Sequence, residues 1–463
     1  MHSPLLLEND PIAGLATPPG NSALAIIRLT GLKLRERLLP LLRRPNGRHA
    51  TLNDFTPRML QRIDLMDFPT HGKMPLDKAM MVYFPAPHSY TGEDVVELHC
   101  HGSPVVVKRI LELLTDLNIR PAKPGEFTRR AYLNGKMDLT QAEALISLIN
   151  SATLRSAQEA IRQMEGSLSK RITQAKEQLL TILAHIEASL DFADEDVTPL
   201  PSQALLMEIA GVAESLGQLL RTAVLGKHLQ DGFQLLIAGS PNVGKSSLFN
   251  RLLGRSRAIV AATPGTTRDC IESHIEIQGI PVLLIDTAGL RQTDEAVEAE
   301  GIKLTRERLG QADGVLLVLD AQQPISEESL ELMRSLKNGI IVWNKIDLYH
   351  NDLPLINTNW PVIKISCLTG DGLDSLLSAI AGLLLPLPID GEGAVIMAAR
   401  QREAMVLAIH ALAECEALIV HGKPGEITAL PLRTALQALG EMVGQVTHDA
   451  LLDRIFGTFC IGK

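Results

Sequence analysis

The sequence predicts a multidomain protein. We expect an α+β domain at the N-terminus, an α-helical central domain, and an α/β domain inserted between two parts of the helical domain. Three observations predict this fold class. At 463 residues the chain is too long for one hydrophobic core and suits about three domains. Strand-like apolar runs mark residues 1–125 and 233–385, and apolar residues at helical spacing mark the segments between and after them.

The N-terminal region alternates apolar runs with turn residues, which is typical of strands. The runs are residues 23–29, 78–84 and 94–100, and a helical pattern covers residues 105–117. This mixture predicts an α+β domain over residues 1–130.

Helical spacing begins near Thr140, where apolar residues recur three and four positions apart. It continues over residues 203–227 and returns at 398–420 and 430–455, after a segment rich in proline and glycine. We therefore expect a helical domain in two parts, residues 131–230 and 389–463, with the α/β domain inserted at 231–388.

The inserted region opens with a glycine-rich loop, GSPNVGKS at residues 239–246, between a strand-like run and a helical stretch. Such a loop binds phosphates, because its backbone N–H groups and the helix dipole converge on the anion. Lys245 would reach the outer phosphates, and the Ser246 hydroxyl would bind Mg²⁺. Similar patterns occur in other loops, so this motif alone does not decide the function.

Two further motifs follow in order, each after an apolar run. Asp286 begins DTAG; its carboxylate would act on the metal through a water, and Gly289 would offer its N–H to the γ-phosphate. In NKID, residues 344–347, Asp347 can accept hydrogen bonds from N1–H and the amino group of guanine. Adenine leaves this carboxylate unpaired, which costs roughly 1–3 kcal/mol. Together the three motifs predict a GTPase with an α/β P-loop (Ras-like) domain.

The residues expected to bind nucleotide extend beyond these anchors, and Ser366 is placed to support the base. The full set is Asn242, Val243, Gly244, Lys245, Ser246, Ser247, Thr263, Thr266, Thr267, Asp286, Thr287, Ala288, Gly289, Asn344, Lys345, Asp347 and Ser366.

Composition narrows the class of protein. A hydrophobic content of 46% with 21% charged residues is typical of globular chains. The net charge of −9 argues against indiscriminate nucleic-acid binding, so an RNA partner should meet a local basic surface. A candidate is the basic cluster, for which a solvated helix face is the alternative. The basic cluster comprises Lys33, Arg35, Arg37, Arg43 and Arg44.

Targeting and redox signals are absent from the sequence. The first residues lack a signal-peptide pattern, and no run of 18 apolar residues occurs, so we expect a cytoplasmic protein without stable membrane insertion. The five cysteines are widely spaced and odd in number, which argues against a disulfide framework. The sequence His99-Cys100-His101 lacks further ligands at metal spacing, so we do not expect it to bind a metal.

Several short segments resemble the tRNA-modification GTPases of the MnmE (TrmE) family, in the TrmE-Era-EngA-YihA-Septin-like class of P-loop GTPases. The resemblance covers essentially the whole chain, and the terminal segment is its most specific part. The segments are ATPPG at 16–20, SYTGED at 89–94, PGEF at 124–127, NGKMDL at 134–139, GTTRD at 265–269 and FCIGK at 459–463.

The resemblance implies a homodimer held by N-terminal domains that bind 5,10-methylenetetrahydrofolate or a related tetrahydrofolate. The family's folate contacts fall on Arg28, Glu97 and Lys136. Cationic side chains suit the folate carboxylates, and a carboxylate suits the donor edge of the pterin. Without the resemblance, Arg28 and Glu97 would be read as ordinary charges on a strand face.

The resemblance also implies partners and a reaction. The partners are tRNA and the flavoprotein MnmG (GidA), in a heterotetramer or larger complex. This complex adds an aminomethyl or carboxymethylaminomethyl group to C5 of uridine 34, the wobble position of the tRNA, and uses the one-carbon unit of the folate.

Hydrolysis poses a problem, because Leu290 stands where small GTPases carry the glutamine that orients water. The resemblance implies that K⁺, held where two GTPase domains meet, supplies the missing charge. Its ligands would be the Asn242 side chain and backbone carbonyls at Ala261, Thr263 and Thr266.

Two more catalytic assignments rest on the resemblance. Thr267 would complete the Mg²⁺ shell with Ser246, and Glu298 would orient the attacking water. The alternative for Glu298 is a glutamate that only stabilises a helix N-terminus.

Cys460 is the second candidate for a catalytic residue. Its thiolate could act as a nucleophile or hold an intermediate, and Lys463, in the same terminal motif, and Arg454 could lower the pKa of the thiol. The alternative is a buried cysteine in a helical core.

The sequence thus favours a K⁺-stimulated, dimerising GTPase that acts in tRNA modification. A ribosome-assembly GTPase would share the nucleotide motifs but would normally carry a basic RNA-binding appendage. An additional signalling role is compatible with the same motifs.

Overall fold

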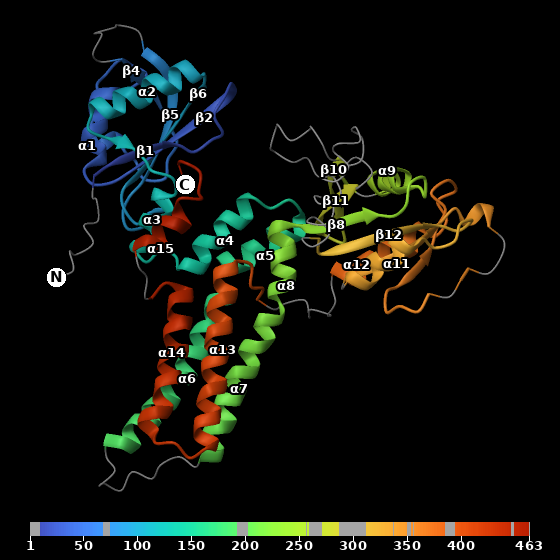
Figure 1. The fold of residues 1–463 in the computed structure, drawn as a ribbon. Coiled ribbons are helices and arrows are strands. Elements are labelled where there is room, and N and C mark those ends of the chain that lie inside the picture. Colours follow the sequence, from blue (N-terminus) through green and yellow to red (C-terminus); the bar gives the residue numbers. More distant parts are fainter. Residues whose placement is uncertain are drawn as a thin grey trace, which may run out of the picture. The chain divides into compact units, whose positions relative to one another are not determined.

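The computed structural model divides into two compact units, residues 1–143 with 443–463 and residues 144–442. Each unit is described by itself (Figure 1). The described residues are 10–67, 75–191, 202–255, 257–258, 271–286, 312–336, 338–349, 353–354, 356–384, 394–445 and 449–462.

Within the described residues, the first unit holds a seven-stranded sheet in the order β3-β4-β5-β6-β2-β1-β7. Neighbouring strands are antiparallel except β1 and β7. The strands are β1 (Ile12–Leu15), β2 (Ser22–Thr30), β3 (Leu42–Arg43), β4 (Gln61–Met66), β5 (Pro75–Phe84), β6 (Val95–Gly102) and β7 (Arg120–Pro121). The predicted N-terminal strands lie within β2, β5 and β6, except that the run at 94–100 starts one residue before β6.

Alternating burial explains why this sheet forms. Ala25, Ile27 and Leu29 of β2 are buried on one face, where they join Ile110 and Leu113 of α2 in a common core. The predicted helix is α2, which begins at a proline, a residue favoured in the first turn. The helices of this unit are α1 (Leu34–Leu38), α2 (Pro104–Asp116), α3 (Glu126–Leu133) and α15 (Asp449–Phe456), and α4 (Leu139–Ile149) begins in it.

The chain-end helix α15 packs on α3 of the first unit. A Cβ on Gly125, at φ +65°, would lie 2.4 Å from the Phe456 carbonyl oxygen, so only glycine permits this approach. The rings of Tyr132 and Phe459 pack against Phe456. The contacts therefore place residues 443–463 in the same compact unit as the N-terminal region. The helical spacing of the sequence instead predicts that they belong with residues 389–442. The predicted functional domain boundaries stay a prediction.

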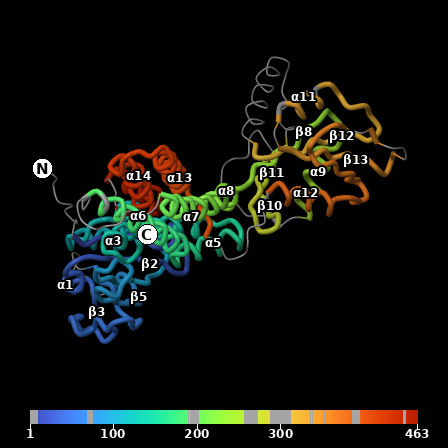
Figure 2. The backbone as a smooth tube through the Cα atoms, turned by 90° about the horizontal axis from the view of Figure 1, so that it is seen from below, coloured from blue at the N-terminus to red at the C-terminus, as the bar shows by residue number. Residues whose placement is uncertain are grey.

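The second unit contains a bundle of long helices, α6, α7, α13 and α14, that lie together in two views (Figure 1, Figure 2). The stretch predicted at 203–227 is interrupted at Thr222, so it forms nearly all of α7 and the first half of α8. Among the described helices of this unit, α8 (Ala223–Asp231) packs on the sheet through Leu225 and Leu229. The helices outside the sheet layers are α5 (Leu154–Met164), α6 (Ser167–Asp191), α7 (Ser202–Arg221), α13 (Ala399–Val420) and α14 (Gly425–Val443).

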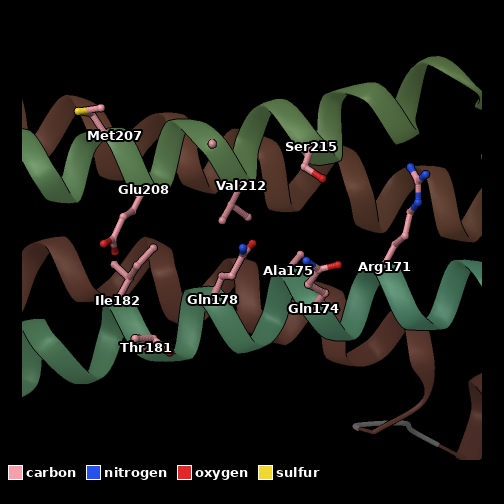
Figure 3. A pocket seen from close by; sticks show the side chains of 11 residues that line it. Arg171, Gln174, Ala175, Gln178, Thr181, Ile182, Met207, Glu208, Val212 and Ser215 are labelled. Atoms are coloured by element: carbon pink, nitrogen blue, oxygen red, sulfur yellow. The ribbon is translucent and has the colours of Figure 1, made fainter.

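A groove of about 750 Å³ runs between α6 and α7. Figure 3 shows Gln178 and Ile182 of α6 facing Glu208 and Val212 of α7 across it. The groove contains none of the motif residues, so it is separate from the predicted nucleotide site.

Within the described residues, the second sheet has the order β14-β13-β12-β8-β11-β10-β9. The strands from β14 to β11 are parallel, and β10 and β9 are antiparallel to their neighbours. The strands are β8 (Phe233–Ala238), β9 (Arg257–Ala258), β10 (Ile271–Ile277), β11 (Ile280–Asp286), β12 (Gly314–Asp320), β13 (Gly339–Asn344) and β14 (Val362–Lys364).

Helices cover both faces of this sheet. Residues of α9 (Lys245–Arg255) and α12 (Leu373–Leu384) pack on one face, and α11 (Glu327–Ser335) packs on the other. Every residue of β12 and β13 is buried, which explains their continuous apolar sequence. Ligands of such sheets bind at the carboxyl ends of the strands, where the three motifs fall.

Glu126 holds the start of α3 through a buried ion-pair network. Burial by itself would raise the pKa of its carboxyl, but hydrogen bonds from Arg120, the Lys123 N–H and Arg130 outweigh it and hold the pKa at about 2. Because the folded pKa lies below the ordinary value of 4.5, the stabilisation is complete above pH 4.5 and is lost as pH falls toward 2.

We expect Glu126→Gln to destabilise the N-terminal unit by roughly 3 kcal/mol at pH 7, because it removes the buried carboxylate that Arg120 and Arg130 share and leaves them with Asp10 and Glu93. Amide hydrogen exchange of the full chain measures this as faster exchange in α3 and β1. The matched control is Glu112→Gln, which removes a more exposed pair with Arg109. Equal protection in the Glu126 variant and the wild type would contradict the assignment.

Candidate functional site

The loop between β8 and α9 takes a backbone path that requires glycine at two positions. Gly239 and Gly244 have φ of +146° and +100°. A Cβ on Gly239 would lie 2.3 Å from the Val318 carbonyl oxygen, and one on Gly244 would lie 2.2 Å from the Asn344 Nδ2. The glycines therefore bring this loop against β12 and the NKID segment.

Lys245 is the first residue of α9 and is buried. Its Nζ donates hydrogen bonds to the Gly239 carbonyl at 2.9 Å and the Ser240 carbonyl at 2.8 Å. The ammonium group thus lies within the loop, at the positive end of the helix dipole. This arrangement suits an anion such as a phosphate.

Ser246 and Asp286 meet at the ends of α9 and β11. The Ser246 Oγ donates to the Asp286 Oδ2 at 3.0 Å, and Asp286 is fully buried. A hydroxyl and a carboxylate side by side are hard oxygen donors, which Mg²⁺ prefers. The residues present therefore fit Mg²⁺, which Ser246 would hold directly and Asp286 through a water.

The buried Asn344 side chain connects two loops. Its Nδ2 donates to the Val243 carbonyl at 2.9 Å, and its Oδ1 accepts from the Cys367 N–H at 3.0 Å. One side chain thereby sets the separation of the phosphate loop from the loop after β14.

Lys345 adds a second connection to the phosphate loop. Its Nζ donates to the Asn242 carbonyl at 3.0 Å and pairs with the buried Asp320 at 2.7 Å. Sequence reasoning did not single out Asp320, although its position at the end of the apolar strand β12 was an available signal.

Asp347 and Ser366 lie in the segments predicted to hold the base. Asp347 lies in a short 3₁₀ helix (Ile346–Leu348), and within the described residues its carboxylate accepts no hydrogen bond. The buried Ser366 Oγ accepts from the N–H groups of Leu368 and Thr369 and shapes the loop after β14. Asp347 is thus available to pair with a ligand. Ser247 is exposed on α9.

Several predicted site residues lie outside the described residues, and nothing is concluded about their placement. They are Ala261, Thr263, Thr266, Thr267, Thr287, Ala288, Gly289, Glu298 and Lys463.

In the N-terminal unit, Arg28 and Glu97 face each other directly across β2 and β6. The Arg28 Nε donates to the Glu97 Oε1 at 2.9 Å, and the guanidinium lies 5.5 Å from the centre of the Tyr90 ring. Lys136 packs beside Gly92, and its Nζ donates to the Pro87 carbonyl at 2.9 Å. The loop that contains Tyr90 and Gly92 therefore contacts two of the predicted folate residues.

The terminal segment lies against the same strands. Arg28 Nη1 donates to the Gly462 carbonyl at 3.4 Å. A Cβ on Gly462 would lie 2.3 Å from the Leu15 carbonyl oxygen, and one on Gly14 would lie 2.9 Å from the Gly462 Cα. Two glycines far apart in sequence thus permit close backbone contact, which sequence reasoning missed.

Cys460 differs from the other described cysteines. Its side chain is exposed, whereas Cys100, Cys367 and Cys415 are buried, and burial raises the pKa of each of those thiols to about 11. The interpretation of Cys460 as a buried core cysteine is therefore wrong.

The His99-Cys100-His101 side chains have separate partners. His99 faces Glu97, His101 pairs with Asp77, and the Cys100 thiol donates to the Ala25 carbonyl. Within the described part of the chain, no group of three potential ligands could hold a metal ion.

Arginines of the basic cluster make hydrogen bonds and a ring contact within the N-terminal unit. Arg37 donates to the Leu117 and Asn118 carbonyls, and Arg44 donates to Gln61. Arg35 lies over the Tyr83 ring. These contacts favour a structural role for the arginines.

The parallel sheet, the phosphate loop and the three motifs at its carboxyl edge define a P-loop GTPase. Comparison identifies the family. A model described as MnmE helical domain matches residues 139–460, and one described as GTP-binding protein TrmE N-terminus matches residues 11–136. The chain belongs to the MnmE family of tRNA modification GTPases.

Curated relatives named tRNA modification GTPase MnmE match along the whole chain. The protein of Magnetococcus marinus is 44% identical, with 100% of each chain covered. Those of Aquifex aeolicus and Koribacter versatilis are 41% and 40% identical over 98% of this chain and 100% and 99% of their own lengths. The protein is thus a GTPase that takes part in tRNA modification. Among the described helices, none has the length and apolar character needed to span a bilayer.

Asp347→Asn should change the preferred base from guanine to xanthine. The amide nitrogen can donate to the C2 carbonyl of xanthine, but, unlike the carboxylate oxygen that it replaces, it cannot accept from the amino group of guanine. We expect the KM for GTP to rise about tenfold or more and turnover of xanthosine triphosphate to appear, as measured by phosphate release.

The control for this substitution is Asp374→Asn, whose carboxylate is exposed on α12 and pairs with Arg255. It should leave base preference unchanged. If Asp347→Asn retains the preference for guanine, Asp347 does not read the base.

Proposed function

We propose that GTP hydrolysis by this protein drives conformational change in a complex that modifies C5 of uridine 34 in tRNA. The added aminomethyl or carboxymethylaminomethyl group takes its one-carbon unit from 5,10-methylenetetrahydrofolate or a related folate. The observation that carries this proposal is the position of the terminal segment, whose Gly462 contacts Arg28 beside an exposed Cys460. A candidate nucleophile and a candidate folate site therefore belong to one unit.

In the proposed folate site, Arg28 and Lys136 bind the ligand's carboxylates and Glu97 accepts from its pterin. Arg28 and Glu97 are only partly exposed, at 22% and 16% of their side-chain surface, and they pair with each other. An anionic group of a ligand can pair with Arg28 in place of Glu97, and a donor group of the same ligand can pair with Glu97 in place of Arg28. The pair thus fits a ligand of that chemistry.

In the proposed nucleotide cycle, Lys245 binds phosphate, Ser246 and Thr267 hold Mg²⁺, and Asp347 reads the base. The γ-phosphate orders the segments around Thr267 and Gly289, and hydrolysis releases them. GTP supplies free energy and contributes no atoms to the modified base.

We also propose that K⁺ completes the catalytic site when two GTPase domains meet. Asn242 supports it: the residue is exposed at the tip of the phosphate loop with φ +62°, and within the described residues its side chain makes no hydrogen bond. Its side-chain oxygen is thus available to a cation. The carbonyls at Ala261, Thr263 and Thr266 supply the remaining protein ligands.

The proposed assembly is a cytoplasmic homodimer that joins the flavoprotein MnmG in a heterotetramer or larger complex and binds tRNA. Redox chemistry on the base belongs to the flavin of the partner. This chain supplies the folate, the thiol and the nucleotide-driven motion.

Nucleoside mass spectrometry of bulk tRNA tests the proposal. Cells that lack the protein should lose the C5-modified wobble uridines, and wild type should restore them. Cys460→Ser should not restore them, because a hydroxyl is a far weaker nucleophile at neutral pH. Its neighbour Ile461, also exposed, offers the control Ile461→Ala, which should restore them. Unchanged nucleosides in the deletion would reject the tRNA function, and full restoration by Cys460→Ser would reject the role of the thiol.

Glu298→Gln should lower GTP turnover about 100-fold or more while GTP affinity stays within about twofold, because the amide cannot act as the base that orients water. Phosphate release in KCl measures turnover, and titration with a non-hydrolysable GTP analogue measures affinity. The neighbouring Glu295→Gln is the control and should keep wild-type turnover. Replacement of KCl by NaCl should lower wild-type turnover, and equal rates in both salts would reject the K⁺ site.

A further inference from the structure

Arg251 makes a two-point contact from the phosphate-loop helix to the loop after β14. It lies on α9, six residues after Lys245, and donates from Nε to the Cys367 carbonyl at 2.7 Å and from Nη2 to the Leu368 carbonyl at 2.6 Å. The motifs of the nucleotide site did not predict this contact, because Arg251 lies on an exposed part of the helix.

The two carbonyls belong to the loop that Asn344 also holds. Cys367 donates its N–H to Asn344, and Asn344 donates to the Val243 carbonyl of the phosphate loop. The chain runs from Val243 through Lys245 into α9 and so to Arg251. Hydrogen bonds and covalent backbone therefore form a closed ring, and Arg251 supplies one of its links.

The loop keeps its local shape without Arg251. The Ser366 Oγ accepts from the N–H groups of Leu368 and Thr369, and the Gly370 N–H donates to the Ser366 carbonyl at 2.8 Å. These bonds lie within the loop. Arg251 instead joins the loop to a different element, so it controls where the loop lies relative to α9.

An arginine suits this task better than other side chains. Its planar fork presents two N–H groups in fixed geometry, which matches two successive carbonyl oxygens. A lysine carries the same charge but lacks the fork.

We propose that Arg251 is a positioning residue for guanine specificity. It holds the Ser366–Thr369 loop at the distance from the phosphate-loop helix at which the base pocket matches guanine. This inference rests on the nucleotide site proposed above. Arg251 itself touches neither the base nor the phosphates in this proposal, so its loss should weaken base recognition and leave phosphate binding intact.

The test is nucleotide binding by the full chain with Arg251→Ala. Calorimetric titration should show about tenfold weaker GDP binding, the scale of one or two exposed hydrogen bonds, with ADP binding unchanged. Steady-state hydrolysis should show a raised KM for GTP with kcat retained. Arg251→Lys should recover less than half of the loss in the logarithm of the GDP binding constant, because lysine restores the charge but not the planar fork.

Arg255→Ala is the matched control, since it removes an exposed arginine of the same helix that pairs with Asp374. It should bind GDP as the wild type does. Equal losses of GDP and ADP affinity in Arg251→Ala would overturn the proposal in favour of a general structural role, as would full rescue by lysine. Unchanged GDP affinity would overturn it directly.

Asp347→Asn separates this inference from the site on which it rests. If that variant changes base preference and Arg251→Ala binds GDP normally, only the role of Arg251 fails. If Asp347→Asn retains guanine preference, the base site itself is misassigned.

Discussion

The nucleotide site depends on one buried side chain, Asn344, which connects the phosphate loop to the loop after β14. Both ends of its amide are engaged: the nitrogen donates to the Val243 carbonyl, and the oxygen accepts from the Cys367 N–H. Because an unpaired buried backbone group costs about 1–3 kcal/mol, loss of this side chain would leave two such groups and would remove one of the links that hold the two loops. The two loops proposed to recognise the phosphates and the base are thus connected within the fold.

A second constraint operates in the N-terminal unit, where distant parts of the chain meet at glycines. Gly14 and Gly462 allow backbone contact that any Cβ would prevent, and Gly125 does the same beneath Phe456. The contact between Gly14 and Gly462 closes a loop that contains most of the chain. Closing it costs conformational entropy, although this cost grows slowly with loop length. The packed rings of Tyr132, Phe456 and Phe459 bury apolar surface that offsets it. The result positions an exposed thiol in the unit that carries the Arg28–Glu97 pair.

The Arg28–Glu97 pair is a structural contact between two residues that are proposed to bind a ligand. Arg28 and Glu97 satisfy each other across two strands, so the sheet is not destabilised by isolated charges. Both groups are partly exposed, and a ligand with complementary groups can exchange for the internal bonds at modest net cost. The guanidinium also contacts the Tyr90 ring and the Gly462 carbonyl.

The sequence alone determined the class of each domain and the chemistry of the nucleotide site. Local patterns carry that information: alternating apolar residues predict strands, helical spacing predicts helices, and a phosphate loop needs glycine where the backbone approaches closely. Lys245, Asp286 and Asp347 were therefore identified before their surroundings were known. Only the tertiary structure decided which distant residues meet. Gly14 with Gly462, Asp320 with Lys345, and Arg251 with Cys367 are pairings between segments whose own patterns say nothing about each other. Helical spacing over residues 430–455 likewise predicted helix, but it did not reveal that α15 packs on α3, because an apolar face specifies burial and not its partner.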